Sequence, residues 1–243
     1  EGTFRLTHDK RPAPQAGDDW LFFHNDVGHR GYIKRGPEPP LSMAWAAPVG
    51  GTIHIASPVI VDGRVCVGTS FNESLDDCGV VAVDLATGRK LWKTPTDSSI
   101  MHSTAAWKDN VLAVSQAGTL YCLDREGRQR WTSPLAKVGN QRWELSFPVT
   151  DGRTVFAGRC EGFGAYDLVT GKAIWNKSGG RDWWPNIYSG PSLGANGTVY
   201  QGGPFVRALN SASGEELWNR AETAVSTVAV VPAVVESGEN GDR

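Results

Sequence analysis

The sequence lacks any long apolar run, and no stretch approaches the roughly 18 consecutive apolar residues that a membrane-spanning helix needs. Residues 1–17 are polar and contain proline, unlike the charged and then apolar segment of an export signal. A basic excess is also missing, because 24 Lys and Arg stand against 26 Asp and Glu. Phosphate binding needs clustered cations, so nucleic acid is excluded as an expected partner. We expect a soluble chain without a membrane span, any export signal lying outside it.

Cysteine is scarce, and the four cysteines form neither a CxxC pair nor a metal-ligand spacing. They are Cys66, Cys78, Cys122 and Cys160. We expect them to be core or hairpin residues, because free cysteine is among the most often buried residue types. Cys66 and Cys78 flank one connecting loop, so we place them on neighbouring strands. If the protein is exported, a disulfide between them could add about 3 kcal/mol of stability.

One pattern does recur, a strand that ends in tryptophan four residues after a turn glycine. Its four copies end at Trp92, Trp131, Trp175 and Trp218, which are 39, 44 and 43 residues apart. A period near 40 residues is typical of one four-stranded blade of a β-propeller. No window shows a convincing 3.6-residue apolar period, so we predict an all-β fold.

Each element of the repeat has a physical role. The Asp or Asn before the turn can accept hydrogen bonds from backbone N–H groups two residues on, and glycine supplies the positive φ that the turn requires. The tryptophan then buries a large ring between neighbouring blades and donates its N–H to a nearby carbonyl. We therefore expect the four repeat tryptophans in equivalent buried positions, as a tryptophan docking motif.

A second hairpin precedes each tryptophan hairpin. In the first copy, the apolar stretch 58–61 is followed by Asp62-Gly63 and then by the alternating stretch 64–67. Residues 106–111, 148–152 and 191–197 are the equivalents in the later copies. A blade is thus predicted to contain four short antiparallel strands.

The two ends of the chain match only parts of a blade. Residues 232–238 resemble the opening strand and turn of a fifth blade, and residues 41–45 resemble an outer strand that would close the ring. We expect residues 1–17 to be a linker or the end of a preceding domain. Residues 18–243 would then form a partial propeller of four complete and two partial blades. The rest of a parent chain or another subunit would be needed to complete the ring.

Residues 57–92 carry the pattern S-P-x-x-x-D-G-x-V-x-x-G followed by A-x-D-x-x-T-G-x-x-x-W, and residues 19–31 carry D-W-x-x-F-x-x-D-x-x-x-x-G. Together these resemble the PQQ-like repeat family. That family includes quinoprotein alcohol dehydrogenases, an outer-membrane assembly lipoprotein of Gram-negative bacteria and many other extracytoplasmic proteins. The resemblance implies a β-propeller in a periplasmic or secreted protein.

The same resemblance bears on cofactors and on neighbouring domains. Quinoprotein dehydrogenases carry an adjacent Cys-Cys pair against the quinone, and this sequence has none. We therefore expect no cofactor, with PQQ and calcium as the alternative. Similar bacterial propellers often follow a catalytic domain such as a calcineurin-like metallophosphoesterase, and residues 1–6 could be the last strand of such a neighbour.

Three residues of the opening motif could suggest a metal site. His24, Asp26 and His29 are close in sequence, and imidazole and carboxylate both ligate zinc. The alternative is that Asp26 anchors a turn while the aromatic residues of 20–23 cover the end of the ring. We favour this structural role and predict no metal site.

Candidate ligand residues lie on the loops that join one blade to the next and open at the mouth of the central channel. Aromatic rings stand there beside charged and imidazole groups, which suits a sugar or peptide ligand. The candidates are His54, His102, Arg142, Trp143, Glu144, Trp183, Trp184 and Tyr188. The alternative is that the tryptophans pack between blades and the charges are only solvated. No catalytic residue is predicted, although Glu144 and His102 could in principle do acid–base work.

These patterns favour a non-catalytic binding or protein-interaction module of a larger extracytoplasmic protein, with protein or carbohydrate contacts at the channel-mouth loops. The alternative is an enzyme with its active site at those loops, either a PQQ-dependent dehydrogenase or a carbohydrate-active enzyme. Fold alone does not decide between them, because function belongs to the site.

Overall fold

The computed structural model describes residues 19–31, 39–71, 73–135, 146–159, 162–178, 190–194, 196–202 and 206–220. These residues form four antiparallel sheets of four strands each, and in every sheet the strands neighbour one another in chain order. We call the sheets the first to fourth blades. The first contains β1 (Val59–Val61), β2 (Arg64–Thr69), β3 (Gly79–Asp84) and β4 (Lys90–Pro95); the second β5 (Ala105–Trp107), β6 (Asn110–Val114), β7 (Thr119–Leu123) and β8 (Gln129–Pro134). The third contains β9 (Val149–Thr150), β10 (Thr154–Arg159), β11 (Gly162–Asp167) and β12 (Ala173–Ser178); the fourth β13 (Pro191–Leu193), β14 (Thr198–Gln201), β15 (Val206–Asn210) and β16 (Glu216–Arg220).

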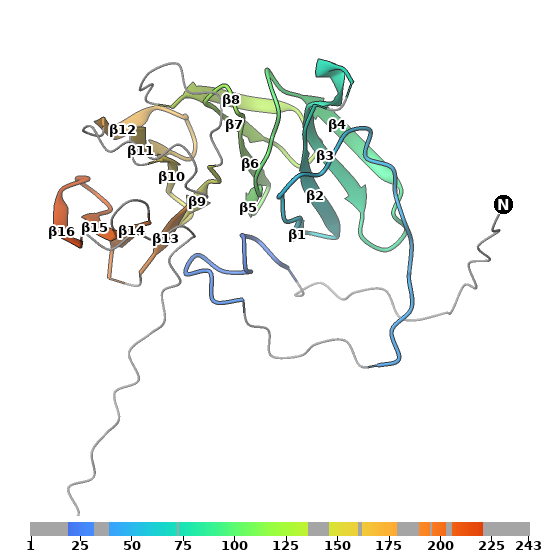
Figure 1. Cartoon of the computed structure of the whole chain (residues 1–243), viewed down its shortest axis with the longest axis horizontal. Helices are drawn as coiled ribbons and strands as arrows, with labels where there is room; N and C mark the ends of the chain where they lie inside the picture. Colours follow the sequence, from blue (N-terminus) through green and yellow to red (C-terminus); the bar gives the residue numbers. More distant parts are fainter. Residues whose placement is uncertain are drawn as a thin grey trace, which may run out of the picture.

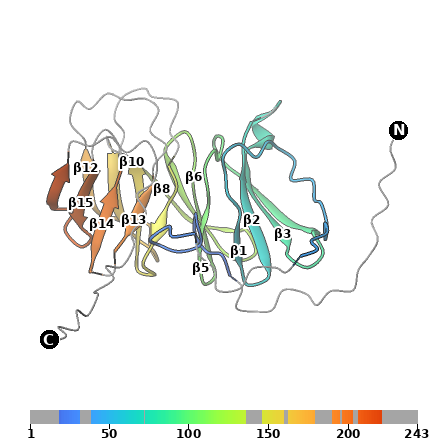
Figure 2. The same ribbon diagram turned by 60° about the horizontal axis from the view of Figure 1, so that its bottom comes forward.

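The four blades follow one another along an arc (Figure 1). Their first strands, β1, β5, β9 and β13, line the concave side, and their last strands lie toward the outside. Figure 2 shows the strands of neighbouring blades standing side by side. The arrangement is a partial β-propeller, which confirms the predicted fold class. Among the described residues the only helix is the three-residue 3₁₀ turn η1 (Leu75–Asp77).

The outer hairpin of each blade has the same register. A β-bulge in the fourth strand, one residue before each tryptophan, sets that tryptophan opposite a small or thiol side chain of the third strand. The pairs are Ala82 with Trp92, Cys122 with Trp131, Ala165 with Trp175 and Ala208 with Trp218. In the first hairpin the carboxylate of Asp84 accepts hydrogen bonds from the backbone N–H and the hydroxyl of Thr87. The equivalence predicted for the four tryptophans is confirmed.

Each docked tryptophan joins its own blade to the next one along the arc. The indole N–H donates to a backbone carbonyl of the neighbouring outer hairpin: Trp92 to Arg125 at 3.0 Å, Trp131 to Leu168 at 3.0 Å and Trp175 to Ser211 at 2.9 Å. The ring lies so close to the hairpin glycine that a Cβ added there would come within 2.6–2.7 Å of it. Glycine is therefore required at these turns for space as well as for positive φ.

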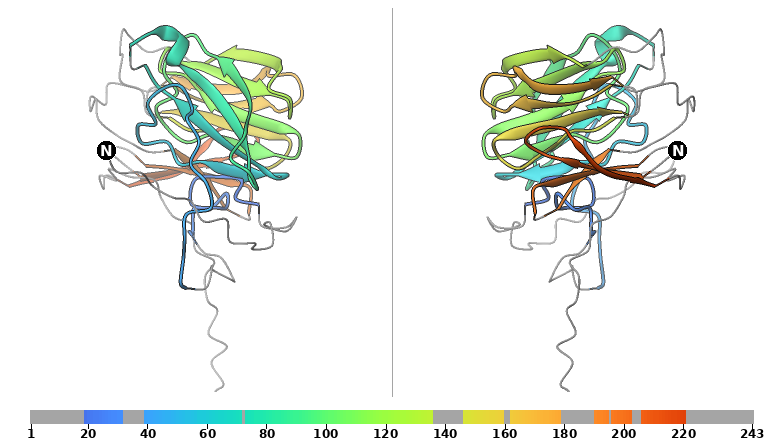
Figure 3. Two further views of the ribbon diagram at one scale, coloured as in Figure 1. Left: turned by 90° about the vertical axis from the view of Figure 1, so that its right-hand side faces the viewer. Right: turned by 90° about the vertical axis from the view of Figure 1, so that its left-hand side faces the viewer.

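The tryptophans at the two ends of the row of blades differ from what the sequence predicts. Trp218 is 42% exposed, because the described residues contain no further blade for it to dock on; the prediction that it is buried was wrong. The other three repeat tryptophans are half-buried. Residues 41–45 were predicted as a strand, but no strand is assigned within 39–50. Trp45 nevertheless docks on the first blade as the others dock, with its indole N–H 2.8 Å from the carbonyl of Leu85. Figure 3 shows this segment across the open end of the first blade.

The cysteines are buried but not bridged. Cys66, Cys78 and Cys122 are free thiols in the core, and Cys160 lies outside the described residues. Cys66 is paired in register with Ala82, four residues beyond Cys78. Four residues of strand span about 13 Å, so the two thiols lie too far apart along the strand pair for a disulfide. The suggested bridge was therefore wrong, and burial raises the pKa of the Cys66 thiol to about 12.

A segment before the first blade holds the concave side together (Figures 1 and 2). Residues 19–31, which we call the axial segment, accept hydrogen bonds from the first strands of three blades. The backbone N–H groups are those of Ile60, Ala106 and Leu193, and the carbonyls are those of Trp20, Leu21 and Val27, at 2.7–2.8 Å. The three donors occupy the same register position in β1, β5 and β13. One short segment thus connects the first, second and fourth blades.

The predicted linker 1–17 and the predicted fifth-blade residues 232–238 lie outside the described residues. Within the described part of the chain, no helix is long and apolar enough to cross a membrane.

Candidate functional site

The loops predicted to form the channel mouth are only partly described. Arg142, Trp143 and Glu144 fall within 136–145, and Trp183, Trp184 and Tyr188 fall within 179–189, both outside the described residues. Their role at the channel mouth stays a prediction. His54 lies just before β1 and is exposed, with no hydrogen bond or ring contact to any described residue.

His102 lies just before β5 and is buried, with 6% of its surface exposed. Its ring packs 4.5 Å from the ring of Phe147 and 5.4 Å from that of Phe23. Its Nδ1 accepts a hydrogen bond from the backbone N–H of Ser103, which places the imidazole proton on Nε2. Burial lowers the pKa of His102 to about 4, so the ring is neutral at physiological pH. In the described residues this histidine is part of an aromatic core.

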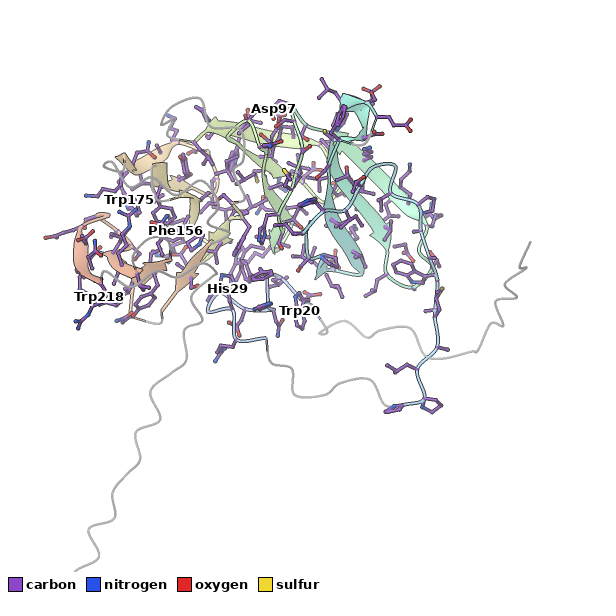
Figure 4. All side chains as sticks on the ribbon, in the orientation of Figure 1. Trp20, His29, Asp97, Phe156, Trp175 and Trp218 are labelled. Atoms are coloured by element: carbon purple, nitrogen blue, oxygen red, sulfur yellow. The ribbon has the colours of Figure 1, made fainter. Side chains whose placement is uncertain are left out.

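His29, from the axial segment, belongs to the same cluster and is 2% exposed (Figure 4). Its ring lies 5.3 Å from Phe147. Its Nδ1 lies 2.6 Å from the carbonyl oxygen of Phe23, and its Nε2 lies 2.9 Å from that of Pro191 in β13. Burial lowers the pKa of His29, although both carbonyls favour its charged form. A neutral ring can donate to only one of these oxygens at a time.

The structure supports a structural role for the opening motif. The carboxylate of Asp26 accepts from the backbone N–H of Gly28 at 2.8 Å and from Nε of Arg30 at 2.8 Å, which fixes a turn. His24 is exposed and stacks on Phe23, with ring centroids 3.9 Å apart. No three His, Cys, Asp or Glu side chains within the described ranges are grouped to hold a metal ion.

A pocket that the sequence did not reveal opens on the face formed by the hairpin turns, which we call the hairpin face. Its volume is about 550 Å³, and it lies beneath the axial segment between blades two, three and four. It is lined by Asp26, Val27, Gly28, Arg30, Trp107, Thr150, Asp151, Phe156, Leu193, Gly194, Gly197, Thr198 and Ser211. No motif marks these residues, because they come from five separate stretches of the chain.

The outer strand of the fourth blade is the most exposed strand of the molecule's described part. Every residue of β16 is exposed, including Leu217 at 51% and Trp218 at 42%. Figure 4 shows Trp218 at the outer end of the arc, whereas Trp175 lies between the third and fourth blades. The right-hand view of Figure 3 looks onto this end of the arc. Leu217 and Trp218 are therefore two large apolar side chains open to solvent on the same strand.

Comparison with known proteins places the fold in a defined group. The family model described as "Outer membrane protein assembly factor BamB" matches residues 44–133 and 118–240. The serine/threonine-protein kinase AfsK of Streptomyces coelicolor is 28% identical over 164 residues, which are 67% of this chain and 19% of the kinase. The chain therefore spans about a fifth of the length of this curated relative.

Solved structures agree on the architecture. The quinohemoprotein alcohol dehydrogenase of Comamonas testosteroni matches with a TM-score of 0.67 and 20% identity, over 85% of this chain and 41% of that chain. BamB of Moraxella catarrhalis matches with a TM-score of 0.56 and 19% identity, over 73% of this chain and 54% of that chain. At these identities the likeness concerns the fold alone.

Proposed function

Because the chain belongs to the PQQ-like propeller family described as outer membrane protein assembly factor BamB, we propose that it is a non-catalytic interaction module of a larger extracytoplasmic protein. The observation that carries this proposal is the exposed outer strand β16 with Trp218. In the preceding blades the equivalent tryptophan is covered by a neighbour.

The partner's chemistry follows from what covers the other tryptophans. Trp92, Trp131 and Trp175 each lie on a hairpin glycine and donate to a backbone carbonyl of that hairpin. Trp218 has both the ring and the N–H to do the same. We expect its partner to be a blade hairpin with a turn glycine, supplied by the rest of the parent chain or by another subunit. An exposed strand edge and apolar face favour this kind of pairing.

The relatives support a module and not a free-standing enzyme. BamB is by name an assembly factor, and AfsK is a kinase of which this chain matches only 19%. A propeller beside a separate catalytic domain is the arrangement we propose here. AfsK suggests a kinase domain as one such catalytic neighbour. The metallophosphoesterase domain expected from the sequence stays a prediction.

A PQQ-dependent reaction fits the described residues poorly. The sequence has no adjacent cysteine pair, and the described residues offer no group of three metal-ligating side chains. The concave side is occupied by the axial segment and by the rings of Phe23, His102 and Phe147. We therefore derive no step through a quinone or calcium ion.

A photo-crosslinking experiment tests the proposal in the full-length protein in its own cells. We would place p-benzoylphenylalanine at position 218 and, as the control, at the exposed Phe71 on a loop of the first blade. We expect position 218 to crosslink to a blade hairpin, either within the parent chain or in another subunit. Crosslinking no stronger than at position 71, or only to proteins without such a hairpin, would refute the proposed contact.

A further inference from the structure

The pocket on the hairpin face has its origin in a difference between two blades. Trp107 ends β5 and pairs with Asn110 across a two-residue turn. In the third blade, Asp151 occupies the same position, since its backbone N–H bonds to the carbonyl of Thr154 across a two-residue turn. A small carboxylate thus stands where the second blade has an indole.

The indole of the second blade fills the space above the next blade. A Cβ added to Gly152 would come within 2.6 Å of the Trp107 ring. Asp151 is too small to cover the fourth blade in the same way, so the volume of about 550 Å³ remains open. Such a volume lies within the range of small-ligand sites. The axial segment covers one side, with Asp26 and Arg30 in the lining.

The lining combines apolar faces with neutral and charged hydrogen-bonding groups. Trp107, Phe156 and Leu193 supply the apolar surface. Hydroxyls come from Thr198 and Ser211, whereas the hydroxyl of Thr150 donates to the carbonyl of Thr154 and accepts from the N–H of Gly152. A ligand must therefore present an apolar face and several polar groups at once.

The charges of the lining disfavour an anionic ligand. Asp26 and Arg30 form an ion pair at 2.8 Å, so they offer an acceptor and a donor side by side. Asp151 adds a second carboxylate, whose Oδ1 accepts from the backbone N–H groups of Arg153 and Thr154. Its Oδ2 has no hydrogen bond to any described residue. Because the guanidinium of Arg30 is already paired with Asp26, the carboxylate of Asp151 remains as net negative charge, which disfavours an anion and offers an acceptor to hydroxyl groups.

We propose that this pocket binds a neutral carbohydrate of one or two pyranose units. The C–H face of a pyranose packs against the Trp107 indole, and its hydroxyls donate to Asp151 and Asp26 and accept from Arg30. The site is independent of the contact proposed for Trp218, because it lies on the hairpin face between other blades.

Titration calorimetry with cellobiose, maltose and N,N′-diacetylchitobiose tests the site on the purified chain. We expect saturable binding of at least one of these sugars. Asp151→Asn should weaken it about tenfold, because a neutral acceptor forms a weaker hydrogen bond than a carboxylate. Asp109→Asn, in the equivalent turn of the second blade and outside the pocket, should leave binding unchanged.

A variant whose pocket is filled tests the sugar site more decisively than Asp151→Asn does. Asp151→Trp supplies in the third blade the residue that the second blade already has, so we expect a folded protein that loses sugar binding at least a hundredfold. Circular dichroism and the thermal midpoint would report folding separately.

No binding of any of the three sugars to the wild-type chain would overturn the proposal. Binding that survives in a folded Asp151→Trp variant would also overturn it, because the sugar would then sit elsewhere. The variant Trp218→Ala should bind sugar normally, which separates this outcome from failure of the interaction proposal.

Discussion

Replacing Gly171 by alanine tests the contact that joins the second and third blades. Gly171 has φ +71°, and an added Cβ would lie 2.6 Å from the indole of Trp131 and 3.0 Å from the hydroxyl oxygen of Ser133. The same change at Gly63 is a matched control. Gly63 has φ +70°, but an added Cβ there meets nothing within 4 Å. The two variants share the backbone strain and differ only in the contact.

The expected costs follow from these geometries. Alanine in the left-handed region costs on the order of 1–2 kcal/mol, offset by about 0.4–1 kcal/mol from the less flexible unfolded chain. Gly63→Ala should therefore lose roughly 0–1.6 kcal/mol. Gly171→Ala adds overpacking of about 1–3 kcal/mol and strains the hydrogen bond from Trp131 to Leu168. We expect the difference between the variants to be about 2 kcal/mol.

Urea unfolding followed by circular dichroism measures both variants, and unchanged slopes would show that the unfolded states are comparable. Equal losses of stability, within about 0.5 kcal/mol, would refute the idea that the ring presses on the hairpin. The blades would then be joined mainly by the cores between the sheets.

Three further outcomes are expected. Because burial lowers the pKa of His102 from 6.5 to about 4, its contribution to stability is complete above pH 6.5 and is lost as the pH falls toward 4. At 1.36 kcal/mol per pKa unit, the stability lost on acidification amounts to about 3 kcal/mol. The urea midpoint of His102→Gln should therefore fall less steeply between pH 7 and pH 4.5 than that of the wild type. Parallel curves for the two proteins would contradict this expectation. Cys66 should resist N-ethylmaleimide at pH 8 until urea unfolds the protein, and non-reduced peptide mapping should find no link to Cys78. The purified chain should self-associate in sedimentation experiments, and Trp218→Ser should reduce this self-association. A closed, very stable monomer would mean that β16 and Trp218 are covered within the chain itself.

The repeat could be predicted from the sequence because the residues that define it lie close together in the chain. An Asp or Asn, a turn glycine and a tryptophan at fixed spacing determine one hairpin, and the hairpin determines the register that places Trp92 and Trp131 equivalently. The errors concern features set by distant partners. Burial of Trp218 depends on a neighbouring blade, and a bridge between Cys66 and Cys78 depends on how far each lies along a strand pair.

The candidate site was less predictable for the same reason. His102 is a loop residue by sequence, and only the packing of Phe23 and Phe147 around it makes it a core residue. The pocket on the hairpin face depends on Asp151 replacing a residue of the size of Trp107. That difference has meaning only after the hairpins have been aligned by register.

The axial segment has a consequence for the order of events in folding. His29 contacts the carbonyl of Pro191, 162 residues further along the chain, and Val27 accepts from Leu193. Each blade can close its own hairpins as soon as its 40 or so residues have been synthesised, but these contacts must wait until the fourth blade has left the ribosome. Among the described residues, the stretch synthesised first is therefore among the last to reach its final place.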